Sequence, residues 1–98
     1  MIHILLVCSA GMSTSMLVRK MNESAKKKGI DAEIWAVGEA EAERHVEHAD
    51  IILLGPQIRF MRKKIQEIAL DTPVSVIDMS DYGSMNGESV LVKAIEAI

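Results

Sequence analysis

The sequence predicts an α/β domain with helices on both faces of a four-stranded parallel sheet. Three observations support this class: four short apolar runs have the length of strands, segments with helical periodicity separate them, and 98 residues suit a single domain. Strands that alternate with helices form parallel sheets with right-handed connections. We therefore expect one domain over residues 1–98, with the strand order 2-1-3-4 of a small doubly wound sheet.

The first half of the chain is predicted to form two strands and one long helix. Residues 2–7 are apolar and mostly branched, which favours a strand, and a loop of small polar residues follows. A helix is expected over residues 14–28, because apolar side chains recur every four positions from Leu17 and Gly29 follows as a stop. Residues 32–37 form the second predicted strand.

The second half of the chain repeats this alternation. A short helix is expected over residues 39–48, and the uninterrupted apolar residues 51–54 suit a central strand that is covered on both faces. From residue 58 to residue 68, apolar residues recur at spacings of three and four, which predicts a helix. Residues 74–77 form the fourth predicted strand. A polar loop over residues 78–87 then leads to a last amphipathic helix.

Composition and charge exclude several classes of function. The net charge of −3 is divided almost evenly between the two halves of the chain, so no basic region is available for nucleic acid or a membrane surface. No apolar stretch approaches the ~20 residues of a membrane-spanning helix, and no signal peptide is evident. The one cysteine, Cys8, excludes an internal disulfide and a multi-thiolate metal site. We expect a cytoplasmic protein that is not inserted in the membrane.

The loop after the first strand has the composition of an anion-binding site. Cys8 ends the strand where the predicted strand order reverses, which is where open α/β sheets bind ligands. The small residues after Cys8 allow the backbone to wrap an oxyanion at the positive end of the next helix. The same dipole favours the Cys8 thiolate, which is the nucleophilic form. The sequence therefore indicates a phosphocysteine held by backbone amides and formed on one exposed thiolate.

A simpler interpretation of Cys8 has to be weighed beside this one. A lone cysteine at a strand end is more often a small buried hydrophobic residue than a nucleophile, and serine-rich loops often only cap helices. Cys8 alone favours that interpretation. The combination of Cys8 with a loop of small residues, a following helix and a reversal of strand order favours the nucleophile instead.

A comparison with low-molecular-weight tyrosine phosphatases indicates which reaction the loop supports. In those enzymes an arginine stands six positions after the cysteine, where its guanidinium binds the phosphoryl group and stabilises the transition state. Thr14 occupies that position in this chain. Without the arginine, hydrolysis loses its main electrostatic stabilisation, so a long-lived phosphocysteine that waits for another acceptor is the favoured interpretation.

Three segments of the chain carry a resemblance to a known family. Residues 8–15 read CSAGMSTS and resemble the active-site segment of the IIB component of the lactose/cellobiose family, part of the bacterial phosphoenolpyruvate-dependent sugar phosphotransferase system. Residues 53–60 resemble the third-strand loop of that family, and residues 82–87 resemble its last loop. Phe60 is a departure, because many relatives carry tyrosine there.

The resemblance implies a phosphoryl-carrier subunit. A phosphohistidine on a IIA protein would pass its phosphoryl group to Cys8, which would pass it to a hydroxyl of a β-glucoside or disaccharide bound by a membrane IIC protein. Neither transfer needs a metal ion or a cofactor on this chain. The resemblance also implies the topology of low-molecular-weight tyrosine phosphatases. We expect a monomer, since such a carrier must expose the same face to two partners in turn. It leaves the sugar open among cellobiose, chitobiose, lichenan fragments and lactose.

The resemblance also assigns residues to the site. Backbone N–H groups of a phosphate-binding loop (P-loop) are expected to hold the phosphoryl oxygens, with Ser13 and Thr14 adding side-chain donors. Gln57 and Tyr82 are candidates for the rim. The predicted phosphate-binding loop comprises Ser9, Ala10, Gly11, Met12, Ser13, Thr14 and Ser15.

Two other functions stay open at this point. A small phosphatase or arsenate reductase with an incomplete loop would use Asp78 or Asp81 as its general acid, although turn formation and helix capping explain both carboxylates at least as well. A non-catalytic flavodoxin-like or receiver-like interaction module would leave Cys8 inert. Phosphate-ester hydrolysis and thiol reactivity distinguish these alternatives from a carrier.

The histidines and the basic residues have simpler explanations. His45 and His48 lie three positions apart on a predicted helix with no third ligand in view, which favours an exposed helix face over a metal site. His3 begins the first strand and is therefore expected at the opposite end of the sheet from Cys8. The third predicted helix carries a basic face that suits solvent or an acidic partner. That face comprises Arg59, Arg62, Lys63 and Lys64.

Overall fold

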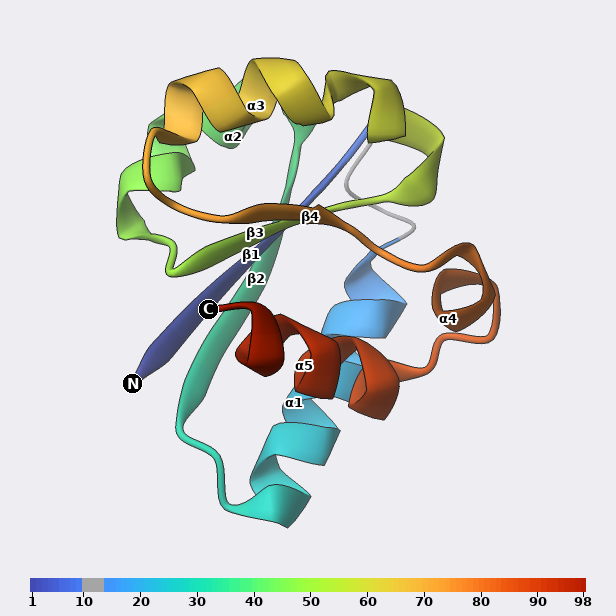
Figure 1. Cartoon of the computed structure of the whole chain (residues 1–98). Coiled ribbons are helices and arrows are strands. Elements are labelled where there is room, and N and C mark those ends of the chain that lie inside the picture. Colours follow the sequence, from blue (N-terminus) through green and yellow to red (C-terminus); the bar gives the residue numbers. More distant parts are fainter. Residues whose placement is uncertain (10–13) are drawn as a thin grey trace.

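A parallel sheet organises the chain, in a computed structural model that describes residues 1–9 and 14–98. The strands follow the order β2-β1-β3-β4, which confirms the predicted fold class and strand order (Figure 1). Each strand pairs in parallel with its neighbours. The strands are β1 (Ile2–Cys8), β2 (Ala32–Gly38), β3 (Ile51–Leu54) and β4 (Val74–Val76).

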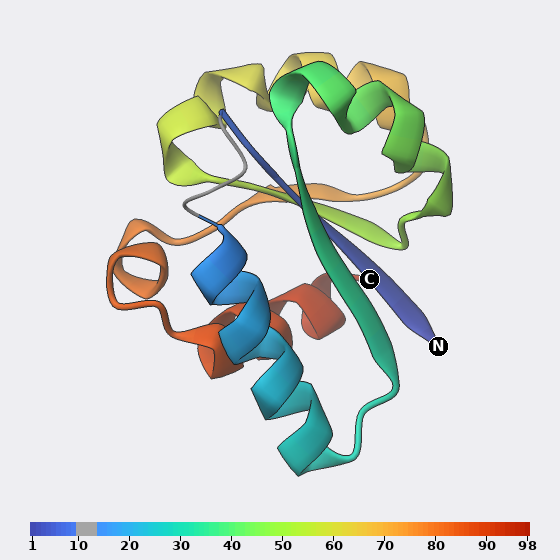
Figure 2. The same cartoon turned by 180° about the vertical axis from the view of Figure 1, so that it is seen from behind.

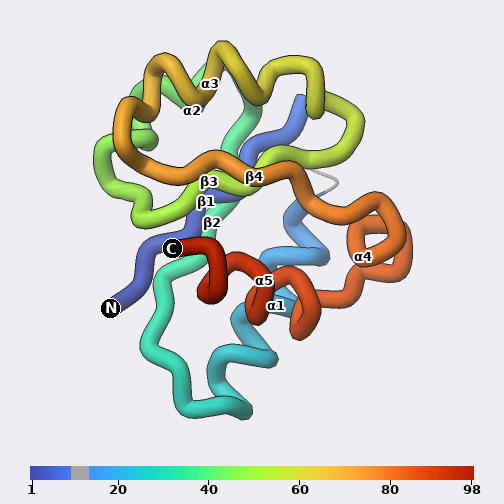
Figure 3. Tube along the Cα trace, viewed as in Figure 1, coloured from blue at the N-terminus to red at the C-terminus, as the bar shows by residue number. Residues whose placement is uncertain are grey.

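Helices cover both faces of this sheet, as expected. Helices α1 and α5 lie side by side on one face, while α2 and α3 lie on the other (Figures 1 and 2). The two chain ends lie near each other, on the side of the molecule away from α4 (Figure 3). In the described ranges, no helix is long and apolar enough to cross a membrane. The α-helices are α1 (Ser15–Lys28), α2 (Ala42–His45), α3 (Arg62–Ala69), α4 (Met79–Gly83) and α5 (Gly87–Ala97).

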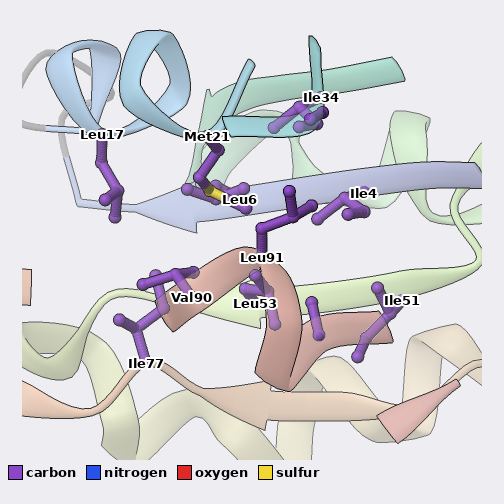
Figure 4. Packing of buried hydrophobic residues seen from close by; sticks show 12 residues of the cluster. Ile4, Leu6, Leu17, Met21, Ile34, Ile51, Leu53, Ile77, Val90 and Leu91 are labelled. Atoms are coloured by element: carbon purple, nitrogen blue, oxygen red, sulfur yellow. The ribbon is translucent and has the colours of Figure 1, made fainter. Parts of the chain in front are cut away.

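The hydrophobic core consists of one cluster on each face of the sheet. Successive residues of β1 point to opposite faces, so Ile4 and Leu6 pack with α1 and α5. Leu5 and Val7 pack with α2 and α3. All four side chains are fully buried, which explains why this strand is apolar without alternation. Figure 4 shows side chains of α1 and α5 converging on the first cluster.

The helix predicted from residue 58 differs from the one observed. A 3-10 segment, η3 (Pro56–Met61), precedes α3, and the backbone of Ile58 is non-helical with φ −118° and ψ 24°. Ile58 is buried in the cluster beneath α3. Its backbone conformation is therefore determined by this tertiary packing and not by the helical spacing of the sequence. The α-helix therefore begins only at Arg62.

Three other predicted segments also differ in detail. Residues 39–48 are helical, but 3-10 turns, η1 (Glu39–Glu41) and η2 (Val46–His48), flank the single α-turn of α2. The predicted loop over residues 78–87 contains α4, because the Asp78 carboxylate accepts hydrogen bonds from two backbone N–H groups at the start of that helix. The fourth strand ends one residue early, at Val76.

The ends of α1 and α3 differ in backbone strain. Helix α1 ends at Gly29 with φ 69°, the left-handed geometry that glycine adopts freely, and this confirms the predicted stop. Helix α3 ends instead at Leu70, with φ 58° and ψ −110°. The Leu70 side chain is 78% exposed, so little packing offsets the strain of a positive φ at a residue with a Cβ.

Replacing Leu70 with glycine is therefore expected to stabilise the protein. Relief of the strain exceeds the extra chain entropy of glycine, for a net gain of about 1 kcal/mol in the free energy of unfolding. Urea unfolding followed by the fluorescence of Trp35 measures it. Met85 provides the control, because it also has a positive φ, 54°, but packs against the core. Met85→Gly should not stabilise the protein, and an unchanged or lower stability of Leu70→Gly would contradict the strain at Leu70.

Candidate active site

Cys8 ends β1 at the edge of the sheet where the strand order reverses. Its neighbours in the sheet are β2 and β3, so the segments that follow these strands begin beside it. The N–H of Gly55, the first residue after β3, donates to the carbonyl of Val7 at 2.9 Å. The segments η3 and α4 then extend on the side of the molecule away from the chain ends (Figures 1 and 3). The topology therefore brings the segments after β2 and β3 beside the thiol.

The Cys8 thiol is in contact with the start of α1. Its Sγ lies 3.3 Å from Thr14 Oγ1, within hydrogen-bond distance, and both residues have no exposed surface. Thr14 is the N-cap residue of α1, and the first turn of that helix carries no acidic side chain. The positive end of the helix dipole is thus directed at the sulfur without a carboxylate to neutralise it. This arrangement favours an anionic group bound at the sulfur.

The expectation of an exposed thiol is wrong. Cys8 is fully buried, since it ends a central strand and packs against the hydroxyl of Thr14. Burial of this kind is a property of the assembled loops and is not visible in the sequence of one strand.

The predicted phosphate-binding loop is only partly within the described residues. Its flanks are described: Ser9 is exposed after β1, Thr14 is buried against Cys8, and Ser15 is exposed at the first position of α1. The remaining predicted members lie outside the described residues; these are Ala10, Gly11, Met12 and Ser13.

The two rim candidates lie against each other. Gln57 Nε2 donates a hydrogen bond of 3.1 Å to the Tyr82 hydroxyl, which joins η3 to α4. A Cβ placed on Gly55 would lie 2.5 Å from Gln57 Oε1 and 3.6 Å from Cys8 Cβ, so the carboxamide of Gln57 and the cysteine border the same space above Gly55. The structure thus brings both candidates to the Cys8 side of the molecule.

A methyl group at Gly55 is expected to displace Gln57. The contact of 2.5 Å is too short for a real Cβ, and the carboxamide is the flexible partner that must move, so Gly55→Ala breaks the bond to Tyr82. Because Gln57 is exposed, the free energy of unfolding should change by less than about 1 kcal/mol. The side-chain amide resonances of Gln57 in an ¹⁵N–¹H spectrum measure the displacement.

Gly38 supplies the matched control for this prediction. It pairs with Cys8 from β2, and among the described residues a Cβ there would meet only backbone oxygens at 3.8 and 4.0 Å, which are ordinary contacts. Gly38→Ala should leave the Gln57 amide resonances in place. Equal shifts in both variants, or none in Gly55→Ala, would contradict the placement of Gln57.

The carboxylates considered as general acids are engaged elsewhere. Asp78 caps α4. Asp81 accepts hydrogen bonds from Lys93 Nζ at 2.8 Å and Ser89 Oγ at 2.9 Å. The bond from Lys93 is the main cause, and that from Ser89 the second, of a pKa of Asp81 below its ordinary value. The bond to Asp81 in turn raises the pKa of Lys93. An ionised, salt-bridged carboxylate is a poor proton donor, so this geometry does not favour a phosphatase.

The histidines form contacts that are unrelated to Cys8. His3 pairs with Asp50, and its Nδ1 lies 3.2 Å from the carboxylate. The pKa of Asp50 is lowered, mainly by the hydrogen bond from the backbone N–H of His3. His45 Nδ1 accepts a hydrogen bond of 3.1 Å from Trp35 Nε1. Among the described residues, no three His, Cys, Asp or Glu side chains gather as metal ligands.

A groove of about 650 Å³ lies between η3 and α4, next to Gln57 and Tyr82. Two large apolar side chains at its edges are strongly exposed, Phe60 at 78% and Met79 at 64%. Met79 was not predicted to lie at the site. A large apolar residue in an otherwise polar segment could have indicated it. The groove is lined by Pro56, Gln57, Arg59, Phe60, Met79 and Tyr82.

This sheet order, with a cysteine at the end of β1 in contact with the N-cap of α1, defines the α/β class of low-molecular-weight tyrosine phosphatase-like folds. A solved structure of a YwlE mutant from Bacillus subtilis shares the fold, with a TM-score of 0.61 at 17% identity over 93% of this chain and 94% of that one. Within this class the chain belongs to the family described as PTS system, Lactose/Cellobiose specific IIB subunit, whose model matches residues 3–93.

Two relatives agree with this assignment. The PTS system oligo-beta-mannoside-specific EIIB component of Bacillus subtilis (strain 168) is 46% identical over 94% of this chain and 91% of its own length. The solution structure of a cellobiose-specific phosphotransferase IIB component from Borrelia burgdorferi is 48% identical, covers 98% of this chain and 90% of that one, and has a TM-score of 0.81. The chain is thus a IIB component of the sugar phosphotransferase system, a phosphotransferase subunit.

Proposed function

We propose that Cys8 is the phosphoryl carrier of this IIB component. It accepts a phosphoryl group from a phosphohistidine of a IIA protein and passes it to a β-glucoside or disaccharide bound by a membrane IIC protein. The observation that carries the proposal is the contact of 3.3 Å between Cys8 Sγ and Thr14 Oγ1 at the N-terminus of α1. It supplies a nucleophile and a positive dipole end at the same point.

Both transfers are in-line displacements at phosphorus. In the first, the Cys8 thiolate forms the S–P bond while the P–N bond breaks, and the imidazole leaves as a neutral ring that carries a proton on its other nitrogen. In the second, a sugar hydroxyl oxygen forms the O–P bond while the S–P bond breaks, and Cys8 leaves as a thiolate. The hydroxyl proton passes to a base of the membrane protein.

The loop after Cys8 holds the phosphoryl oxygens through its backbone N–H groups. Thr14 adds a side-chain donor and Ser13, outside the described residues, is assigned the same role from the sequence. Absence of the phosphatase arginine leaves the phosphocysteine without its main electrostatic route to hydrolysis. The carrier then retains the phosphoryl group until a sugar arrives.

The partners and the location follow from the same role. One domain over residues 1–98 works as a monomer in the cytoplasm, because it presents the same face to IIA and IIC in turn. It requires no metal ion or cofactor. The sugar stays open, since the names of two relatives of similar identity specify an oligo-β-mannoside and cellobiose.

Transfer from a labelled donor tests the proposal. The chain is incubated with a IIA protein carrying ³²P on its histidine, and the adduct is mapped by mass spectrometry of proteolytic peptides. We expect one acid-labile phosphoryl group per chain, on the peptide that contains Cys8. Label on another residue, or no label with an active donor, would contradict the proposal.

The phosphatase alternative is tested with an aryl phosphate ester. The engagement of Asp78 and Asp81, together with Thr14 in place of the arginine, leads us to expect no hydrolysis above the uncatalysed rate. Sustained turnover that depends on Cys8 would favour a phosphatase over a carrier.

A further inference from the structure

We propose that Asp81 is a positioning residue for phosphoryl transfer: it ties α4 to α5 and thereby holds Tyr82 and Gln57 beside Cys8. The inference rests on the proposed role of Cys8 and concerns how the rim of that site is held in place. It assigns a function to a carboxylate that neither caps a helix nor takes part in the reaction.

Helix α4 depends on polar contacts for its position. None of its five residues is buried, and only Tyr82 packs against the core from within it. Figures 1 and 3 show α4 projecting from the side of the molecule between β4 and α5. A short helix with so little buried apolar surface is stabilised mainly by its hydrogen bonds to neighbouring elements.

The Asp81 carboxylate makes the contact to α5. It accepts hydrogen bonds from Lys93 Nζ at 2.8 Å and Ser89 Oγ at 2.9 Å, and only 14% of its side chain is exposed. Its backbone carbonyl also accepts from the N–H of Asn86 at 2.9 Å, just before α5 begins. A charge-assisted contact of this kind is stronger than a neutral hydrogen bond and fixes the rotation of α4.

The next residue of α4 makes the contact to the rim of Cys8. The Tyr82 hydroxyl accepts from Gln57 Nε2 at 3.1 Å, and the carboxamide of Gln57 borders the space above Gly55 that Cys8 also borders. Asp81 and Tyr82 are adjacent, so any rotation of α4 that follows loss of the Asp81 contact also moves the Tyr82 ring. The two contacts therefore connect Lys93 on α5 to the rim of the reacting thiol.

The first test compares Asp81→Ala with Lys28→Met. Lys28→Met removes the ion pair of 3.1 Å with Glu88, which also involves α5 but does not reach α4. In Asp81→Ala we expect the Gln57 amide resonances to shift and the rate of phosphoryl transfer from the IIA donor to fall about tenfold, the size of effect that outer-shell partners have in other sites. Lys28→Met should change neither. If Asp81→Ala does not fold, Lys93→Met removes the same ion pair from the other end.

A double-mutant cycle with Tyr82→Phe distinguishes positioning from a general loss of structure. If Asp81 acts through the Tyr82–Gln57 bond, Asp81→Ala should lower the transfer rate less than about twofold once that bond is gone. An equal loss in both backgrounds would overturn the proposal, as would an unchanged rate in folded Asp81→Ala. The Gln57 resonances need no phosphoryl donor, so they test the positioning of the rim even if wild-type Cys8 accepts no phosphoryl group.

Discussion

Replacing Cys8 with serine is expected to abolish phosphoryl transfer from the IIA donor. A serine hydroxyl is a much weaker nucleophile than a cysteine sulfur, so the variant lacks the nucleophile. Labelling should fall at least ~10³-fold, the scale on which removal of a catalytic nucleophile acts. The extent of ³²P incorporation at fixed donor concentration measures it. Persistent labelling of Cys8→Ser would exclude Cys8 as the acceptor.

Thr14→Val is the control that separates the nucleophile from its surroundings. Valine keeps the shape of the buried side chain but removes the hydroxyl that lies 3.3 Å from Cys8 Sγ. We expect the loss of this hydrogen bond to lower the rate of phosphoryl transfer to Cys8 about tenfold, while the label remains on Cys8. The contrast between a slowed and an abolished transfer would therefore locate the chemistry on sulfur.

The sheet was predictable because its strands are short apolar runs, and the central strand β3 has one environment along its whole length. Residues 51–54 are apolar without alternation, and the structure buries all four between the two helical layers. The order β2-β1-β3-β4 is the order expected of a small doubly wound sheet, in which right-handed connections join the parallel strands. Such regularities depend only on neighbours in sequence and on the handedness of the chain.

The connections after β3 and β4 were not predictable in the same way. The stripe that begins at Ile58 has helical spacing, yet η3 precedes α3 because Ile58 packs into the second core cluster. Helix α4 was missed because its segment lacks an apolar repeat. The Asp78 cap could have indicated it. Local patterns fail where a tertiary contact or a single cap decides the backbone.

The site was predictable as a set of residue types but not as an arrangement. Cys8 and Thr14 could be placed together, because the end of a strand and the start of the next helix are joined by a short loop. The bond between Gln57 and Tyr82 joins residues 25 positions apart, and no periodicity reports it. The burial of Cys8 is likewise a product of several segments, which is why the expectation of an exposed thiol failed.

Gly87→Ala is expected to lower the free energy of unfolding more than Gly55→Ala or Gly83→Ala. A Cβ at Gly87 would lie 2.4 Å from the backbone carbonyl carbon of Lys20 and 2.6 Å from the N of Met21. Backbone atoms in the middle of α1 cannot move aside as a side chain can, so α5 must shift away from α1 and open the first core cluster. We expect the free energy of unfolding to fall by about 3 kcal/mol.

Gly83→Ala supplies the comparison that isolates this steric cause. It adds the same methyl group to a short helix, α4, where nothing lies within 4 Å of the new Cβ. Stability should stay the same or rise by about 0.5 kcal/mol, because alanine lowers the entropy of the unfolded chain. Urea unfolding followed by Trp35, which packs on the opposite face of the sheet, compares the two variants. Similar losses in both would show that backbone entropy, and not the close approach of α5 to α1, accounts for the glycine at position 87.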